Sequence, residues 1–114
     1  MALALVTGGS RGIGRAICLA LAGRGHDVAF CYSEDGRGAE ETVRLIEERG
    51  AGALAFRCDV ADEGSVKEMF SALPGLRLLV NNAGIALYGE IARTSYADWK
   101  RVMDVNAGGT FLCT

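Results

Sequence analysis

Short apolar runs alternate along the chain with longer stretches whose apolar residues recur every three or four positions. The runs are ALALV (2–6), DVAFCY (27–32), ALAFRCDV (53–60) and LRLLV (76–80). They lack an alternating polar face, so we expect strands that are buried on both sides. The stretches between them predict amphipathic helices at 15–25, 40–50 and 63–73. This alternation predicts an α/β fold with a parallel sheet covered by helices on both faces.

Composition narrows the class of protein. Half of the 114 residues are hydrophobic, only 7% are aromatic, and the net charge is −2. A chain of this length forms one domain at most, and its charge gives no reason to expect nucleic acid or an acidic membrane as a partner. No apolar run approaches the ~20 residues of a membrane-spanning helix, and the N-terminus lacks the basic region of a signal peptide. We therefore expect a cytoplasmic protein.

Four cysteines are widely scattered along the sequence, at Cys18, Cys31, Cys58 and Cys113. No Cys-x-x-Cys pair occurs, and the chain has one histidine. We interpret the cysteines as reduced core thiols and expect no metal, with a metal site as the alternative.

A glycine-rich loop, TGGSRGIG (7–14), joins the first predicted strand to the first predicted helix. Gly8 permits a sharp turn, Gly12 permits close approach of a ligand to the backbone, and Gly14 permits close packing of the helix. The helix then begins with free N–H groups, which favour an anion such as a phosphate. A plain turn is the alternative, but the position between a buried strand and a helix favours a nucleotide site.

The spacing Thr-Gly-x-x-x-Gly-x-Gly resembles the fingerprint of the short-chain dehydrogenase/reductase family. Three further stretches match that family in the same order, namely CDV (58–60), NNAG (81–84) and DVNAGGTF (104–111). The resemblance covers essentially the whole chain, and TGGSRGIGRAI looks most like the 3-oxoacyl-acyl-carrier-protein reductases. It implies a Rossmann-type, doubly wound parallel sheet with strand order 3-2-1-4, of which this chain holds strands one to four.

The resemblance also implies a dinucleotide cofactor at the carboxyl ends of the strands. It places Asp59 beside the adenine, where the carboxylate can accept a hydrogen bond from the adenine amino group. A turn at the end of the strand is the alternative explanation for this aspartate. The Asn82–Gly84 stretch would lie against the cofactor, with a tight turn as the alternative. The expected cofactor-binding residues are Gly8, Gly9, Ser10, Arg11, Gly12, Ile13, Gly14, Tyr32, Ser33, Cys58, Asp59, Val60, Asn82, Ala83 and Gly84.

The tip of the second strand predicts which cofactor is used. An acid there would bind the ribose 2′-OH and select NAD. Tyr32 and Ser33 occupy the tip, and neither is acidic. Arg11 can reach a 2′-phosphate with its planar guanidinium. We expect NADP(H), with NAD(H) as the alternative because Glu34 and Asp35 lie just beyond.

Asn106 is the expected catalytic residue of this chain. Spacings of four and three predict one buried helix face made of Trp99, Met103, Asn106, Thr110 and Cys113. An amide on that face needs hydrogen-bond partners, and the following pair Gly108-Gly109 suggests close approach of backbone or ligand. By the resemblance, Asn106 holds the water that links the active site to solvent, and a buried structural asparagine is the alternative.

The stretch YADWK (96–100) matches the catalytic Tyr-x-x-x-Lys of the family literally but in the wrong place. The resemblance puts that pair after Asn106, together with a catalytic serine. Ser95-x-x-Asp98 is a capping signature that places Tyr96 in the first turn of a helix. We interpret Tyr96 and Lys100 as a solvated pair. We expect residues 1–114 to be the N-terminal, cofactor-binding part of a longer reductase, ending before the catalytic Ser and Tyr-x-x-x-Lys.

These expectations predict an oxidoreductase that transfers a hydride between NADP(H) and a carbonyl or alcohol. The subgroup resemblance implies a small-molecule or acyl-carrier-linked substrate, such as a 3-oxoacyl thioester of fatty acid biosynthesis. It also implies a homotetramer in which the helix of Asn106 takes part. The alternative is a non-catalytic dinucleotide-binding module.

Overall fold

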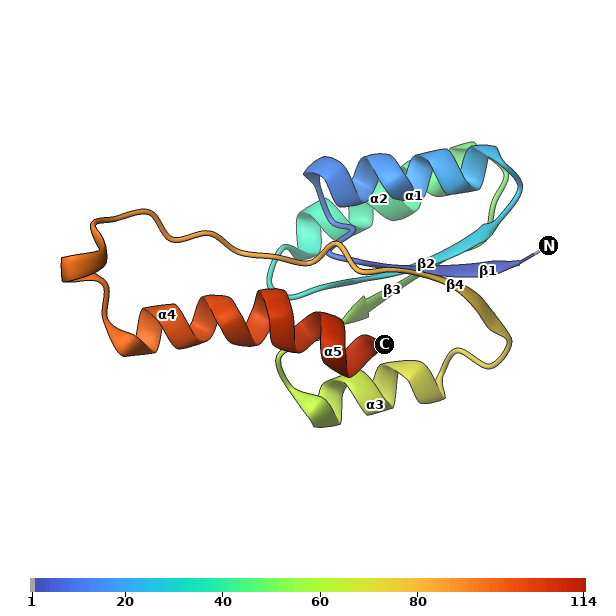
Figure 1. Cartoon of the computed structure of the whole chain (residues 1–114). Helices are drawn as coiled ribbons and strands as arrows, with labels where there is room; N and C mark the ends of the chain where they lie inside the picture. Colours follow the sequence, from blue (N-terminus) through green and yellow to red (C-terminus); the bar gives the residue numbers. More distant parts are fainter. Residues whose placement is uncertain (1) are drawn as a thin grey trace.

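Four parallel strands form the sheet of the computed structural model, which describes residues 2–114 (Figure 1). The strands are β1 (Leu3–Thr7), β2 (Asp27–Tyr32), β3 (Ala53–Arg57) and β4 (Leu76–Val80). Their order is β3-β2-β1-β4, with parallel pairing throughout. The two central strands, β1 and β2, are buried along almost their whole length because helices cover both faces. The predicted α/β, doubly wound parallel sheet is confirmed.

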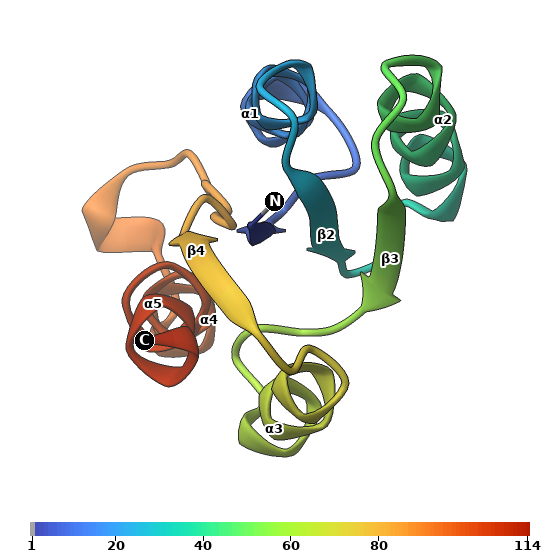
Figure 2. The ribbon, with the colours of Figure 1, turned by 90° about the vertical axis from the view of Figure 1, so that its right-hand side faces the viewer.

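The helices lie in two layers around this sheet. They are α1 (Gly12–Gly23), α2 (Gly36–Glu48), α3 (Glu63–Ser71), α4 (Tyr96–Met103) and α5 (Gly109–Cys113), with a 3₁₀ turn at Ile91–Arg93. Figure 2 shows α1 and α2 on one face and α3 on the other, with α4 and α5 beside β4. Each face has its own apolar core, one around Phe30, Cys18 and Ile46 and one around Leu5, Met69 and Val105.

Several element ends differ from the sequence-based expectation. Helix α2 begins at Gly36 rather than at residue 40, because Asp35 caps it by accepting from Gly38 N at 2.9 Å. Strand β3 ends at Arg57 rather than at residue 60, since the last pair of its ladder with β2 is Tyr32 with Arg57. Asp62 then caps α3 through Ser65 N. These local caps, rather than the hydrophobic period, fix the element ends.

The last helical segment differs most from the expected helix. A π-helical turn at Asp104–Gly108 joins α4 to α5, and the extra residue in that turn rotates the face that the spacing predicts. Trp99 and Met103 are 49% and 43% exposed, and Asn106 and Thr110 are also exposed. The predicted buried face is therefore wrong except at Cys113. The residues buried instead are Val105, Gly109 and Cys113.

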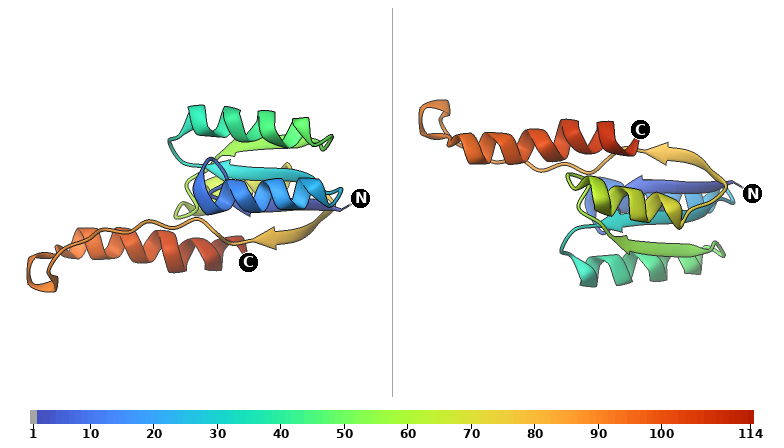
Figure 3. Two further views of the ribbon diagram at one scale, coloured as in Figure 1. Left: turned by 90° about the horizontal axis from the view of Figure 1, so that it is seen from above. Right: turned by 90° about the horizontal axis from the view of Figure 1, so that it is seen from below.

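The segment from residue 85 to α4 projects beyond the end of the sheet (Figure 3). The molecule is consequently elongated, with principal extents of 49 × 25 × 20 Å. The projecting segment carries exposed apolar side chains, including Leu87, Tyr88 and Ile91. At its root, α5 ends beside β4, where Asn81 Nδ2 donates to Thr114 Oγ1 at 3.1 Å.

Candidate cofactor-binding site

The glycine-rich loop is fastened to the end of the neighbouring strand. Gly8 N and Gly9 N both donate to Cys31 O at 3.0 Å. Gly8 has φ +73°, a left-handed conformation that favours glycine. A Cβ on Gly9 would lie 2.6 Å from Cβ of Phe30. The loop thus lies directly on β2, in the position predicted for a phosphate loop.

Helix α1 starts from this loop without a capping side chain. Its N-cap, Arg11, makes no side-chain cap hydrogen bond. A Cβ on Gly12 would meet nothing within 4 Å, so the backbone is open to a ligand there. Unpaired N–H groups and the helix dipole together favour an anion at this point. The sharp turn expected at Gly8 agrees with its positive φ, whereas the close approach of a ligand at Gly12 stays a prediction.

Asn82 ties the end of β4 to the end of β1. Its Nδ2 donates to Thr7 O at 3.1 Å and to Gly8 O at 3.2 Å. The hydroxyl of Thr7 accepts from both Asn82 N and Ala83 N at 2.9 Å. Residues 81–88 form no turn or helix, so the tight-turn interpretation of Asn82–Gly84 is wrong. Thr7, which opens the glycine motif, anchors the backbone after β4, and the sequence reasoning did not expect this role.

A cleft of about 750 Å³ lies at the carboxyl ends of the strands, where ligands bind in sheets of this kind. Among the expected cofactor-binding residues, those that line the cleft are Gly8, Ser10, Arg11, Ile13, Gly14, Tyr32, Ser33, Cys58, Asp59, Val60, Asn82, Ala83 and Gly84. Gly9 and Gly12 do not line it. Residues that were not expected also line it, namely Cys31, Glu34, Asp35, Ile85, Arg101 and Val105.

The Asp59 carboxylate has two partners within the protein. Oδ1 accepts from Ala61 N at 3.0 Å, and Oδ2 lies 3.2 Å from Nη1 of Arg101 on α4. Both side chains are nearly half exposed, so this ion pair contributes little by itself. It nevertheless fixes the orientation of Asp59 on the cleft wall. The expected contact with adenine remains a prediction, since each carboxylate oxygen has a second lone pair.

The two acids beyond β2 are unequal. Asp35 caps α2 through Oδ1, and its Oδ2 lies 4.0 Å from Arg11 Nε. Glu34 and Ser33 are exposed at the cleft. Arg11 is free to move, with 81% of its side chain exposed. Asp35 is thus occupied as a helix cap with Arg11 beside it, whereas the Glu34 carboxylate is exposed at the same end of the cleft.

Asn106 makes two hydrogen bonds to a single residue. Its Oδ1 accepts from Ile85 N at 2.8 Å, and its Nδ2 donates to Ile85 O at 2.9 Å. A Cβ on Gly84 would lie 3.3 Å from the same Oδ1. The amide therefore holds the backbone after β4 against the π-helical turn. Asn106 is not itself a cleft-lining residue, but Ile85 is.

Gly109 explains half of the glycine pair beside Asn106. A Cβ on Gly109 would lie 2.6 Å from Cγ2 of Val60, so the helix packs closely on the loop after β3. Gly108 has no comparable contact, with Met103 O at 3.7 Å as its neighbour. The expected close approach of backbone or ligand therefore applies to Gly109, and its partner is the Val60 side chain.

Tyr96 and Lys100 have separate partners. Ser95 Oγ accepts from Asp98 N at 3.1 Å, which confirms the capping signature. Tyr96 is 72% exposed and stacks on Trp99, with ring centroids 5.8 Å apart. Lys100 Nζ lies 2.6 Å from Asp104 Oδ2, and this bond raises the pKa of Lys100. Neither residue lines the cleft.

Replacing Tyr96 by phenylalanine is expected to leave kcat of the full-length protein within a few-fold of wild type. The ring stacking on Trp99 is retained, and the lost hydroxyl is in solvent. Loss of a true general acid–base group costs ~10²–10⁴-fold. Steady-state kinetics measure the difference, and a loss in that range would place the acid–base chemistry at Tyr96.

All four cysteines are free and buried. Burial raises the pKa of the Cys18 thiol to about 12. A thiol–thiol hydrogen bond with Cys58, together with burial, raises the pKa of Cys31 further, and the same bond lowers that of Cys58. Within residues 2–114, no group of three metal-ligating side chains comes together. Over the same residues, every helix is too short or too polar to cross a bilayer.

The chain is similar in sequence to known proteins. The family described as short chain dehydrogenase matches residues 2–114. The uncharacterized oxidoreductase YgfF of Escherichia coli is 43% identical over 99% of this chain and 48% of its own length. The 3-oxoacyl-[acyl-carrier-protein] reductase FabG of Staphylococcus aureus is 41% identical over 96% of this chain and 46% of its own length.

Solved structures agree with the sequence comparison. A short chain dehydrogenase from Burkholderia cenocepacia, in complex with NADP, has a TM-score of 0.90 and 39% identity, covering 98% of this chain and 47% of that one. A short-chain type dehydrogenase/reductase from Mycobacterium marinum has a TM-score of 0.93 and 32% identity, with the same coverage. The chain spans about half the length of these relatives. Since the family match extends over residues 2–114, the chain belongs to the short-chain dehydrogenase/reductase family.

Proposed function

We propose that the intact protein is an NADP(H)-dependent oxidoreductase that transfers a hydride between the cofactor and a carbonyl or alcohol. The observation that carries the proposal is the cleft at the strand ends. The uncapped start of α1 forms one side of the cleft. The nearby acid Asp35 already accepts a hydrogen bond as the N-cap of α2. An anionic dinucleotide fits that combination of free N–H groups and an exposed arginine.

The residues of the cleft suit different parts of the cofactor. The backbone from Ser10 to Gly14 would bind the pyrophosphate, and Arg11 with Ser33 would bind the 2′-phosphate. Asp59 and Val60 would lie at the adenine, and Asn82–Gly84 would lie along the nicotinamide half. The bound cofactor would supply the hydride. This chain would supply the binding and orientation, because Asn82 fixes the end of β4 against β1 and Asn106 holds Ile85.

Chemistry at the substrate requires groups beyond those assigned here. The family resemblance puts the catalytic Ser and the Tyr-x-x-x-Lys after Thr114, and we propose that the intact protein carries them there. Asn106 would then be the catalytic residue that this chain contributes, through a water held beside Ile85. The FabG relative suggests a 3-oxoacyl thioester as substrate and, by the family resemblance, a homotetramer. A non-catalytic dinucleotide-binding module is the second candidate.

Replacing Arg11 by alanine in the full-length protein is expected to weaken NADPH binding by about tenfold to a hundredfold, the loss typical of hydrogen bonds to a charged group. NADH binding should change little or improve, because Asp35 loses the neighbouring cation. Fluorescence titration gives both dissociation constants. The matched control is Arg37→Ala, which removes another exposed arginine nearby that does not line the cleft.

Two outcomes would count against the proposal. Equal affinity of the wild type for NADPH and NADH, or an unchanged ratio in Arg11→Ala, would contradict the assignment of the 2′-phosphate site. The second candidate is tested separately by following NADPH oxidation with a 3-oxoacyl thioester and with simple ketones. Tight NADPH binding without turnover on any carbonyl would favour the non-catalytic module.

A further inference from the structure

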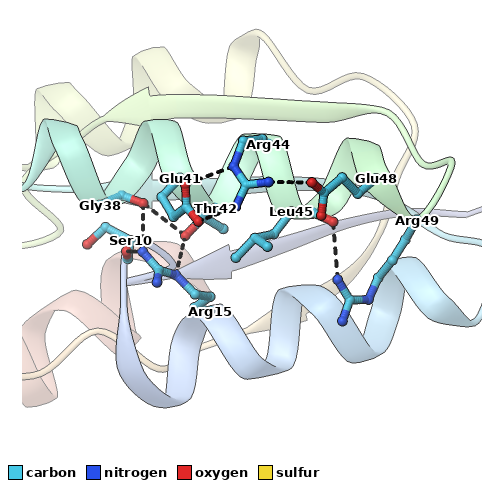
Figure 4. A network of polar contacts seen from close by, with 9 residues as sticks. All are labelled: Ser10, Arg15, Gly38, Glu41, Thr42, Arg44, Leu45, Glu48 and Arg49. Carbon is cyan, nitrogen blue, oxygen red and sulfur yellow. Dashed lines mark hydrogen bonds and ion pairs between the residues drawn. The ribbon is translucent and has the colours of Figure 1, made fainter.

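Arg15 on α1 bridges the glycine-rich loop and the first turn of α2. Its Nη2 donates to Ser10 O at 2.7 Å and to Gly38 O at 3.1 Å, and its Nε donates to Thr42 Oγ1 at 3.0 Å (Figure 4). Ser10 belongs to the glycine-rich loop, and Gly38 belongs to the first turn of α2. A single guanidinium thus joins the phosphate loop to the start of the helix that follows β2.

Thr42 completes the link from the side of α2. It is fully buried, and its hydroxyl donates to Gly9 O at 2.9 Å while accepting from Arg15. The hydroxyl also lies 3.1 Å from Gly38 O. Two carbonyls of the glycine-rich loop, those of Gly9 and Ser10, are therefore bound by side chains from two different helices. We call Arg15 and Thr42 the loop clamp.

The parts that the loop clamp joins are already in contact. A Cβ on Gly38 would lie 2.6 Å from Ser10 O and 2.2 Å from Asp35 Oδ2. The glycine-rich loop and the start of α2 therefore pack without a side chain between them, and the clamp supplies the hydrogen bonds from side chains to the carbonyls of Gly9, Ser10 and Gly38 at this contact. Arg11 and Asp35, the residues proposed at the 2′-phosphate end, sit on these two segments.

The charge of Arg15 has no carboxylate in direct contact among the described residues, although the pKa of the more distant Glu41 is lowered by Arg44 and, to a smaller extent, by Arg15. Within residues 2–114, no carboxylate oxygen lies within 4.0 Å of its guanidinium. All three of its hydrogen bonds go to neutral oxygens. A cation of this kind next to an anion site adds a favourable field for a bound phosphate without touching it. An arginine needed for packing alone would be expected to have a carboxylate partner or an exposed head group.

We propose that Arg15 is a positioning residue of the cofactor site: with Thr42 it sets the separation of the glycine-rich loop and α2, and thereby the affinity of the subsite that takes the phosphorylated adenosine end. This inference rests on the proposed function. The inference goes beyond the proposed function, because Arg15 and Thr42 do not line the cleft and neither is expected from the motif.

The test uses the full-length protein with Arg15→Met and Arg15→Lys variants. Dissociation constants for NADPH and for 2′,5′-ADP, a probe of the adenosine end alone, are measured by calorimetry well below the melting temperature of each variant. Arg15→Met should weaken both ligands by at least about tenfold, the loss expected for hydrogen bonds to a charged donor. Arg15→Lys should recover part of that loss, since a lysine keeps the charge but not the fork.

Two further variants separate positioning from stability. Thr42→Val keeps the side-chain volume and removes the hydroxyl, and it should weaken the binding of 2′,5′-ADP. In the double variant with Arg15→Met the two losses of affinity should not add, because both substitutions break the same link. Arg44→Met is the matched control, since Arg44 lies on α2 but pairs only with Glu41 and Glu48 at the surface. It should bind both ligands as the wild type does.

The outcomes distinguish this inference from the proposed function. If the wild type binds neither NADPH nor 2′,5′-ADP, the proposed function fails. If the wild type binds both ligands, and Arg15→Met lowers the melting temperature but leaves both constants unchanged, Arg15 is structural only and the inference is wrong. If Arg15→Met does not fold, Thr42→Val decides by the same comparison of constants.

Discussion

Replacing Gly14 by alanine is expected to abolish dinucleotide binding by the full-length protein. A Cβ at this position would lie 1.9 Å from Gly8 O and 2.6 Å from Asn82 Nδ2. The first atom is backbone, and the second is held by hydrogen bonds to Thr7 O and Gly8 O, so neither has room to move. One methyl group would therefore push α1 away from the loop and break the bonds that join β4 to β1. Overpacking of this kind costs about 1–3 kcal/mol or more.

Calorimetric titration with NADPH and a thermal melt together measure this effect. The matched control is Gly23→Ala at the other end of α1, where a Cβ would meet nothing within 4 Å. That variant should bind NADPH normally and be slightly more stable, because alanine favours the helix by ~1 kcal/mol over glycine. Wild-type NADPH affinity in Gly14→Ala would show that the helix and loop are not packed as described.

The sequence predicts those parts of the fold that depend on one local signal. The bounds of β2 and β4 are predicted correctly at 27–32 and 76–80, because each is a short apolar run closed by turn residues. The position of the glycine-rich loop follows from the same alternation, whereas the strand order is implied by the family resemblance. The start of α2 is not predicted, because Gly36-Arg37-Gly38 is typical of a loop and only the cap at Asp35 makes it helical.

Features that depend on distant contacts are beyond the sequence pattern. The π-helical turn shifts the buried face of the helix from Trp99 to Val105, and no spacing of apolar residues in the sequence indicates such a turn. The contact between Arg15 and Thr42 joins positions 27 residues apart. Arg101, which pairs with Asp59 across 42 residues, looks in the sequence like an ordinary solvated cation. Most of the expected motif residues line the cleft, whereas residues that act through another element were not expected from the sequence.

Asn106 combines both kinds of information. The motif predicts that Asn106 is functional. The expected burial of its side chain on a helix face is wrong, because the side chain is exposed. Its two hydrogen bonds to Ile85 instead give it a defined task. The strand β4 ends at Val80, and the two hydrogen bonds hold the segment that follows it along the cleft. They use both the N–H and the C=O of Ile85, as pairing with a neighbouring strand would. The amide needs both a donor and an acceptor for this.

Replacing Asn106 by aspartate in the full-length protein is therefore expected to lower kcat/KM by roughly a hundredfold at pH 8, because displacements near 1 Å have effects of that size. The introduced carboxylate still accepts from Ile85 N, but its second oxygen faces Ile85 O across the present 2.9 Å contact and repels it. Protonation of the introduced carboxyl restores a donor, so kcat/KM relative to wild type should rise as the pH falls.

The matched control for this substitution is Asn81→Asp, since Asn81 makes one exposed hydrogen bond, to Thr114 Oγ1, and has no contact with Ile85. It should stay within a few-fold of wild type at every pH. The measurement is kcat/KM for variant and wild type at matched pH values from about 4.5 to 8.5, because the ordinary pKa of an aspartate is about 3.9 and the repelling Ile85 carbonyl would raise it. A ratio that is flat with pH and close to one would mean that the segment after β4 does not depend on the Asn106 amide. A low ratio that does not recover at acid pH would mean that holding Ile85 does not account for the role of Asn106.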